Sequence, residues 1–119
     1  MYSQYAKALF ALQGISKYAL GRIIREVSHE VLRDRYGLKY ETRTWHNQRD
    51  KILASGISMS EGARAVIESG VGTVHLDHQP SIKVLKDQII ASTNEAAVLA
   101  IVESMDFQFL LPEENYQKG

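Results

Sequence analysis

Residues 13–37 read QGISKYALGRIIREVSHEVLRDRYG, a turn followed by a long amphipathic pattern. After Ser16, apolar residues recur every three or four positions, which is the spacing of one face of an α-helix. The pattern predicts a helix that has Ser16 as its N-cap, runs to Tyr36 and Gly37, and carries charged residues on its opposite side. The apolar face contains Leu20, Ile23, Ile24, Val27, Val31 and Leu32.

A shorter helix is predicted just before this one. It is expected over residues 2–12 and to end near Gln13 and Gly14, where the glycine would supply a left-handed stop. Its residues with helical spacing are Tyr5, Ala6, Leu9, Phe10 and Leu12.

Two helices joined by a tight glycine turn, with apolar residues at fixed later offsets, are typical of the helix-turn-helix motif. Leu20 lies six residues after Gly14, and Ile23 lies nine residues after it. In these offsets residues 4–26 resemble the helix-turn-helix motif of repressors. Phe10 departs from the motif, because the position four residues before the glycine is usually held by a small residue.

The resemblance implies that Lys17, Tyr18, Gly21, Arg22 and Arg25 face DNA. Lys17 would contact a phosphate, because a flexible ammonium group contributes charge rather than geometry. Arg22 has a planar guanidinium group that can donate two hydrogen bonds to the edge of a guanine base. Gly21 would let the backbone approach the duplex closely.

Positive charge is concentrated in the first half of the chain. Residues 1–53 contain ten lysines or arginines and five acidic residues, a net charge of +5. The remaining residues contain four lysines or arginines and nine acidic residues, a net charge of −5. This asymmetry suggests that the first half forms a basic binding surface and that the second half is acidic.

Two later helices are predicted from capping boxes, in which a serine and a glutamate three residues later satisfy each other's backbone N–H groups. The sequence SMSE at residues 58–61 predicts a helix that starts after Ser58 and stops at Gly70. The sequence STNE at residues 92–95 predicts a helix over residues 96–105 that is apolar nearly all round.

Two more helices complete the helical prediction. One contains Trp45 as a core residue and closes at Gly56. The other has Pro80 in its first turn, where its missing N–H group does no harm. The inward residues of this second helix are expected to be Ile82, Leu85, Ile89 and Ile90.

Residues 71–77 and 107–111 alternate weakly between apolar and other residues and allow a short two-stranded ribbon. We therefore expect a mainly α, single domain over residues 1–119, with five to six helices and a helix-turn-helix-like N-terminal half. It is divided into a basic half at 1–53, an acidic half at 54–112 and a frayed tail at 113–119.

One further cluster contains residues suited to transition metals. His75, Asp77 and His78 place two imidazoles and a carboxylate within four residues. They are weak candidates for a metal site, because a complete site needs a further ligand and because histidines near a turn are commonly surface residues.

Several classes of function receive no support from the sequence. The chain has no cysteine, which excludes disulfides, thiolate zinc sites and cysteine nucleophiles. No signal peptide or membrane span is present, so a cytoplasmic protein is the default expectation. There is no catalytic motif of high specificity and no cofactor-binding motif, so neither an enzyme nor a cofactor is favoured.

The sequence favours a DNA-binding or DNA-associated protein, such as a small regulator that works through its helix-turn-helix-like element. We also expect a homodimer, because small DNA-binding proteins obtain enough contacts by binding paired half-sites. The apolar helix 96–105 is the candidate dimer interface. Two alternatives stay open: a protein-interaction or adaptor module whose basic face meets an acidic protein, and a metal-dependent enzyme.

Overall fold

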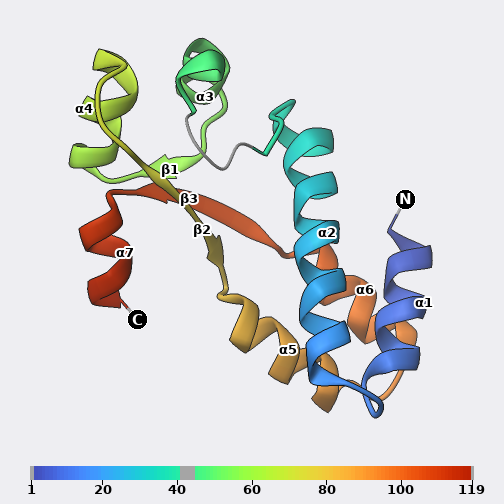
Figure 1. The fold of residues 1–119 in the computed structure, drawn as a ribbon. Helices are drawn as coiled ribbons and strands as arrows, with labels where there is room; N and C mark the ends of the chain where they lie inside the picture. Colours follow the sequence, from blue (N-terminus) through green and yellow to red (C-terminus); the bar gives the residue numbers. More distant parts are fainter. Residues whose placement is uncertain (1, 41–44, 119) are drawn as a thin grey trace. The chain divides into compact units, whose positions relative to one another are not determined.

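The computed structural model describes residues 2–40 and 45–118 and is mainly α, as predicted (Figure 1). Its described helices are α1 (Ser3–Leu12), α2 (Lys17–Tyr36), α3 (Arg49–Ala54), α4 (Glu61–Ser69), α5 (Ile82–Ala91), α6 (Glu95–Glu103) and α7 (Pro112–Lys118), with a 3-10 turn, η1 (His46–Gln48), before α3. The strands β1 (Ser58–Met59), β2 (His75–Gln79) and β3 (Asp106–Leu110) form one sheet in the order β1-β3-β2. None of the described helices is long and apolar enough to cross a membrane.

The contacts divide the chain into two compact units, each built from distant segments. The first unit contains the residues up to Val31 together with Gln79–Asp106, and the second contains the other described residues. Counted over the described residues of these ranges, the first unit has six basic and six acidic residues and the second has seven of each. The charge asymmetry of the two sequence halves therefore disappears within the units, and any basic surface has to be local.

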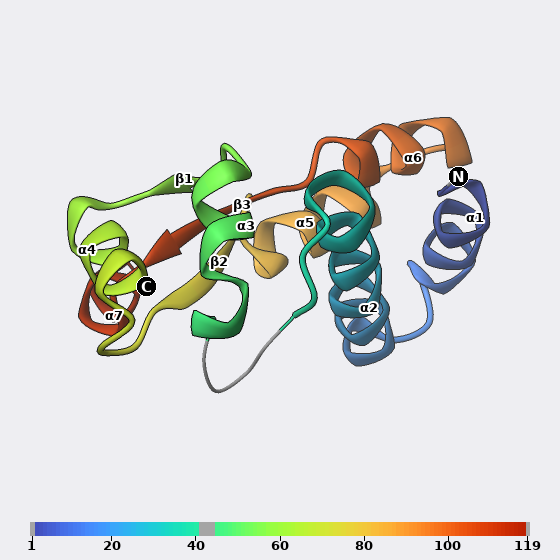
Figure 2. The same ribbon diagram turned by 90° about the horizontal axis from the view of Figure 1, so that it is seen from above.

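In the first unit, α1 packs mainly against α6 and also against α5 (Figure 2). Gly14 does not supply the predicted left-handed stop, since its φ is not among the positive glycine φ angles of the described residues. Instead α1 ends with Gln13 in a right-handed helical conformation. The Gln13 side-chain amide donates hydrogen bonds to the carbonyl oxygens of Ile89 (2.8 Å), Ile90 (3.3 Å) and Ser92 (3.1 Å), which ties this end to the end of α5.

Helix α2 follows its sequence prediction closely. The Ser16 hydroxyl accepts a hydrogen bond from the Ala19 N–H at 3.2 Å, as expected of an N-cap. Gly37 ends the helix with a φ of 69°, and its N–H donates to the Arg33 carbonyl at 2.8 Å. The predicted apolar face is buried at Leu20, Ile24, Val27, Val31 and Leu32, and half-buried at Ile23.

In the second unit, β3 is the central strand. It runs parallel to β1, with Ser58 opposite Gln108 and Met59 opposite Phe109. Phe109 is fully buried and meets the buried Trp45 ring edge-to-face, with 5.1 Å between ring centroids. The predicted ribbon is thus enlarged to three strands, and β2 begins four residues later than the predicted stretch 71–77. Trp45 is a core residue, as predicted.

The predicted start of the fourth helix at Ser58 is wrong, because the backbone of Ser58 pairs with β3. The N-cap is Ser60, whose hydroxyl accepts from the Ala63 N–H at 3.1 Å. The helix stops at Gly70 with a φ of 73°, as predicted. A long-range strand pairing has therefore moved the cap by two residues.

The two following helix starts also differ from their predictions. Asn94, rather than Ser92, caps α6, because its side-chain oxygen accepts from the Ala97 N–H at 2.8 Å. Pro80 lies outside α5, whose N-cap is Ser81. At the start of α6 three residues with capping side chains, Ser92, Thr93 and Asn94, stand in sequence, and the chain path selects the last of them.

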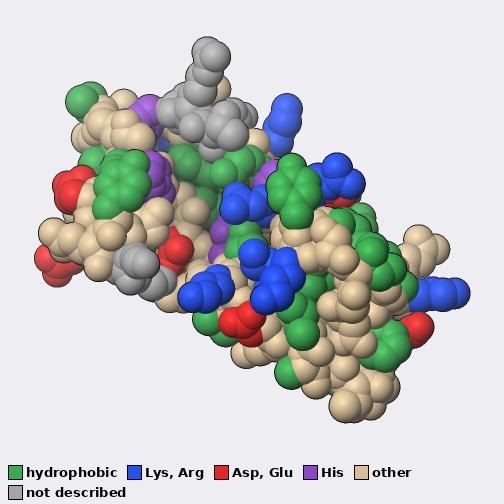
Figure 3. All heavy atoms as spheres, turned by 60° about the horizontal axis from the view of Figure 1, so that its bottom comes forward, with side chains coloured by type: hydrophobic (Ala, Val, Ile, Leu, Met, Phe, Trp, Pro, Cys, Tyr) green, Lys and Arg blue, Asp and Glu red, His purple; other side chains and the backbone are tan. Residues whose placement is uncertain are grey.

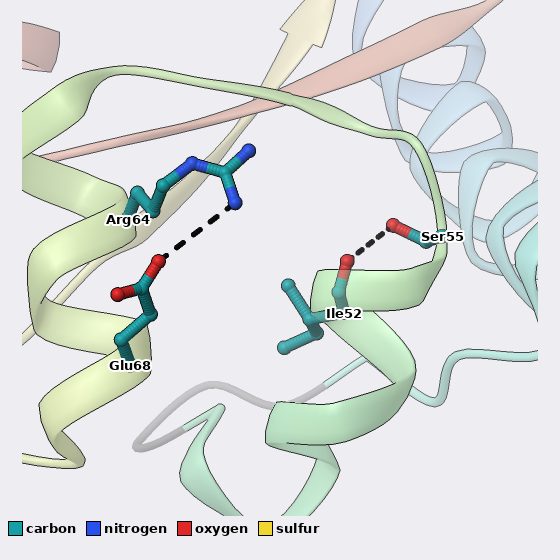
Figure 4. A network of polar contacts seen from close by, with 4 residues as sticks. All are labelled: Ile52, Ser55, Arg64 and Glu68. Atoms are coloured by element: carbon teal, nitrogen blue, oxygen red, sulfur yellow. Dashed lines mark hydrogen bonds and ion pairs between the residues drawn. The ribbon is translucent and has the colours of Figure 1, made fainter.

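Helix α3 ends where the sequence predicted. The Ser55 hydroxyl donates to the Ile52 carbonyl at 2.6 Å, and Gly56 follows with a φ of 80° (Figure 4). On the neighbouring α4, Arg64 and Glu68 form an ion pair of 3.9 Å with both side chains 53% exposed. Such exposed pairs contribute only about 0.3–0.5 kcal/mol, so Arg64 is suitable for a control substitution.

The tail predicted to be frayed is the helix α7. Its carboxylate at Glu114 accepts hydrogen bonds from the Ser60 hydroxyl (2.6 Å) and from the Leu111 N–H (2.7 Å). The second bond is the glutamate half of a capping box, and Pro112 occupies the first helical position. The Ser60 hydrogen bond, with help from the Leu111 amide, lowers the pKa of Glu114 below its ordinary value.

This lowered pKa predicts an acid-dependent contribution of Glu114 to stability. Because folded Glu114 holds its proton less tightly than the unfolded chain does, the contribution is fully present above the ordinary glutamate pKa and is lost as the pH falls through the lowered one. We expect the Tm difference between the wild type and Glu114→Gln to shrink as the pH falls below the ordinary glutamate pKa. Glu113→Gln removes the same charge from the same turn and serves as control. A Tm difference that does not change with pH would contradict this role.

Candidate nucleic-acid interface

The five residues predicted to face DNA lie on one side of α2. Their spacings of three and four residues place them along one stripe of the helix. The structure brings all five together in a hollow of about 220 Å³ within the first unit, where α5 supplies the rest of the lining. The lining residues are Lys17, Tyr18, Gly21, Arg22 and Arg25 from α2, and Ile82 and Lys86 from α5. We call this site the basic hollow.

Two members of the basic hollow were not predicted from the sequence, Ile82 and the charged Lys86. A Cβ atom added at Gly21 would lie 3.4 Å from the Cδ atom of Lys86 and 3.7 Å from its Nζ atom. The lysine side chain therefore passes over the buried Gly21, which lies beneath it rather than on an open surface. Ile82 and Lys86 are one turn apart on α5, but no local signal in the sequence pairs this face with α2.

Four cationic side chains line the basic hollow: Lys17, Arg22, Arg25 and Lys86. Within the described part of the chain, none of them forms an ion pair at 4.0 Å or less. Figure 3 shows lysine and arginine side chains gathered on the visible face. Like charges that line one hollow and are not held in close ion pairs produce a positive potential that attracts anions.

The pKa of the neighbouring histidine lies below its ordinary value. His29 follows Arg25 by one turn of α2. Burial lowers the pKa of His29; Glu26 opposes this shift, and the positive charge of Arg25 reinforces it. His29 does not line the basic hollow, whose charged lining residues are lysines and arginines.

An aromatic side chain accompanies these cations. Tyr18 lines the basic hollow and is 81% exposed. Its ring follows Lys17 directly and lies one turn before Arg22 on the same stripe of α2. Cations interleaved with an accessible aromatic ring provide both phosphate contacts and a surface on which a base can stack.

The arrangement of α1 and α2 differs from that of a repressor motif. The two helices run in opposite directions (Figures 1 and 2), whereas helix-turn-helix helices meet at about 90–120°. The main packing partner of α1 is α6. The basic hollow, rather than the motif, is therefore the feature that bears on nucleic-acid binding.

The weak metal candidates are not brought together. All three lie in β2, but His75 contacts the side chain of Asn115 at 3.2 Å, and Asp77 accepts a hydrogen bond from Gln108 at 2.8 Å. His78 follows Asp77 on the opposite face of the strand. Among the described residues there is no group of three histidine, cysteine, aspartate or glutamate side chains that could hold a metal ion.

Comparison of the chain with models of protein families, with curated proteins and with solved structures gives no match. The functional proposal therefore depends on the residues of the basic hollow.

Proposed function

We propose that the protein binds DNA through the basic hollow. The observation that carries this proposal is the convergence of Lys86 from α5 on the α2 face formed by Lys17, Arg22 and Arg25. Most hydrogen bonds between proteins and DNA go to phosphate and sugar oxygens, and lysine and arginine are suitable donors for them.

The size of the basic hollow favours part of a long polyanion over a small ligand. Its volume of about 220 Å³ is below the roughly 300–1,000 Å³ of pockets that enclose small molecules. It is large enough to receive one phosphate or one base of a nucleic acid, while the neighbouring phosphates lie outside it. An acidic protein would offer carboxylates to the same cations, and tyrosine is also enriched in protein interfaces, so the test below includes polyglutamate.

The predicted homodimer remains part of the proposal. In α6, Val98 and Val102 are buried within the first unit, and Leu99 and Ile101 are half-buried and could extend a seam. Light scattering on the purified protein measures its mass in solution. A monomer at micromolar concentration would remove the dimer from the proposal and leave the basic hollow unaffected.

Removal of two arginines from the basic hollow tests the proposal. We expect Arg22→Ala/Arg25→Ala to weaken DNA binding at low salt at least roughly tenfold, because the loss of even one hydrogen bond to a charged group costs about 1.5–3 kcal/mol. Fluorescence anisotropy with a labelled oligonucleotide measures the change.

The matched control is Arg49→Ala/Arg64→Ala, which removes the same charge from arginines paired with Asp50 (3.6 Å) and Glu68 (3.9 Å). Equal losses in both double variants would show that overall charge, and not the basic hollow, is responsible. A wild type that binds polyglutamate but not DNA at low salt would favour the adaptor alternative.

A further inference from the structure

We infer that the basic hollow takes a single strand of nucleic acid in preference to a duplex, with one unpaired base stacked on Tyr18. This inference rests on the proposed function and specifies its ligand.

The surroundings of α2 disfavour a duplex. An α-helix with its side chains is about 10–12 Å across, and the major groove of DNA is about 12 Å wide. A reading helix must therefore project freely into the groove. Here the stripe that carries Arg22 and Arg25 is covered at Gly21 by the side chain of Lys86, and Ile82 lines the same hollow. Because α5 contributes Ile82 and Lys86 to the same hollow, this stripe of α2 does not project by itself.

A single strand fits a concave basic surface better. Its backbone is narrow and its bases are unstacked, so phosphates can contact cations while a base turns toward an aromatic ring. Lys17 and Lys86 can neutralise phosphates as flexible point charges, and Arg22 lies one turn from the Tyr18 ring on the same stripe. A planar guanidinium beside an exposed ring extends the surface on which a base can stack.

The size of the basic hollow agrees with this arrangement. At about 220 Å³ it accepts one group of the strand, and the ring of Tyr18 is 81% exposed at the same place. The phenolic hydroxyl has no part in stacking, so the ring alone should be required.

The test compares a single-stranded thymidine oligonucleotide of about 12 nucleotides with a duplex of equal length, since single-strand-binding folds cover about 4–16 nucleotides. We expect tighter binding of the single strand. Tyr18→Ala should weaken it about 5- to 150-fold, the effect of losing one stacked base. Tyr18→Phe should retain wild-type affinity.

Tyr116→Ala is the matched control, because Tyr116 is 74% exposed and lies in the other unit. Duplex binding as tight as single-strand binding, or an unchanged single-strand affinity in Tyr18→Ala, would overturn the inference. Either result leaves the proposed function standing if Arg22→Ala/Arg25→Ala still loses binding. A wild type that binds neither oligonucleotide at low salt overturns the proposed function itself.

Discussion

Phe109→Ala is expected to lower the free energy of unfolding by about 3–5 kcal/mol. The ring has no exposed surface, lies in the central strand of the sheet and contacts Trp45 edge-to-face with 5.1 Å between centroids. Its removal costs both the transfer of the ring from water and the cavity left beside Trp45. Aromatic pairs of this geometry add about 0.5–1.5 kcal/mol beyond the buried area.

Denaturant unfolding followed by fluorescence measures this loss. The chain has one tryptophan, and that tryptophan is the neighbour of Phe109, so the signal reports directly on this core. Val71→Ala is the control, since Val71 is 75% exposed and its truncation should change stability by no more than about 0.5 kcal/mol. A Phe109→Ala variant as stable as Val71→Ala would show that the ring is not part of the core.

The elements predicted well are those specified by local signals. In α2 the cap at Ser16, the periodic apolar face and the stop at Gly37 all lie within one continuous stretch. The stops at Gly56 and Gly70 are equally local, because only glycine adopts their left-handed conformation without strain.

The wrong predictions share a different cause. Ser58 has a good capping sequence, yet its backbone pairs with Gln108, fifty residues later in the chain. The tail is helical partly because Glu114 accepts a hydrogen bond from Ser60, 54 residues earlier. Contacts of this kind depend on the path of the whole chain, so no local pattern specifies them.

The candidate site also contains residues that local sequence predicts and a residue that only long-range packing brings in. The stripe from Lys17 to Arg25 follows from helical periodicity alone, and the structure places its five predicted residues together. Lys86 could not be predicted, because it joins them only through the packing of α5 beside α2. The charge asymmetry of the sequence halves was a poor guide, since both units combine segments from each half and are neutral by count.

The salt dependence of binding gives the sharpest measure of how the basic hollow works. If each of its four cations neutralises one phosphate of a single strand, the slope of log affinity against log salt is about −0.7 for each contact, or about −2.8. Binding by the wild type should then weaken about 50-fold between about 50 and 200 mM salt. Arg22→Ala/Arg25→Ala should halve the slope and weaken only about 7-fold over the same range.

This change in slope separates phosphate contacts from other effects of the arginines. If Arg22 and Arg25 only supported the fold of the first unit, their loss would lower affinity at every salt concentration and leave the slope unchanged. The control Arg49→Ala/Arg64→Ala changes the net charge equally but removes no cation from the basic hollow, so its slope should match the wild type. Equal slopes in all three proteins would therefore exclude phosphate neutralisation by these arginines, because counterion release counts contacts and not total charge.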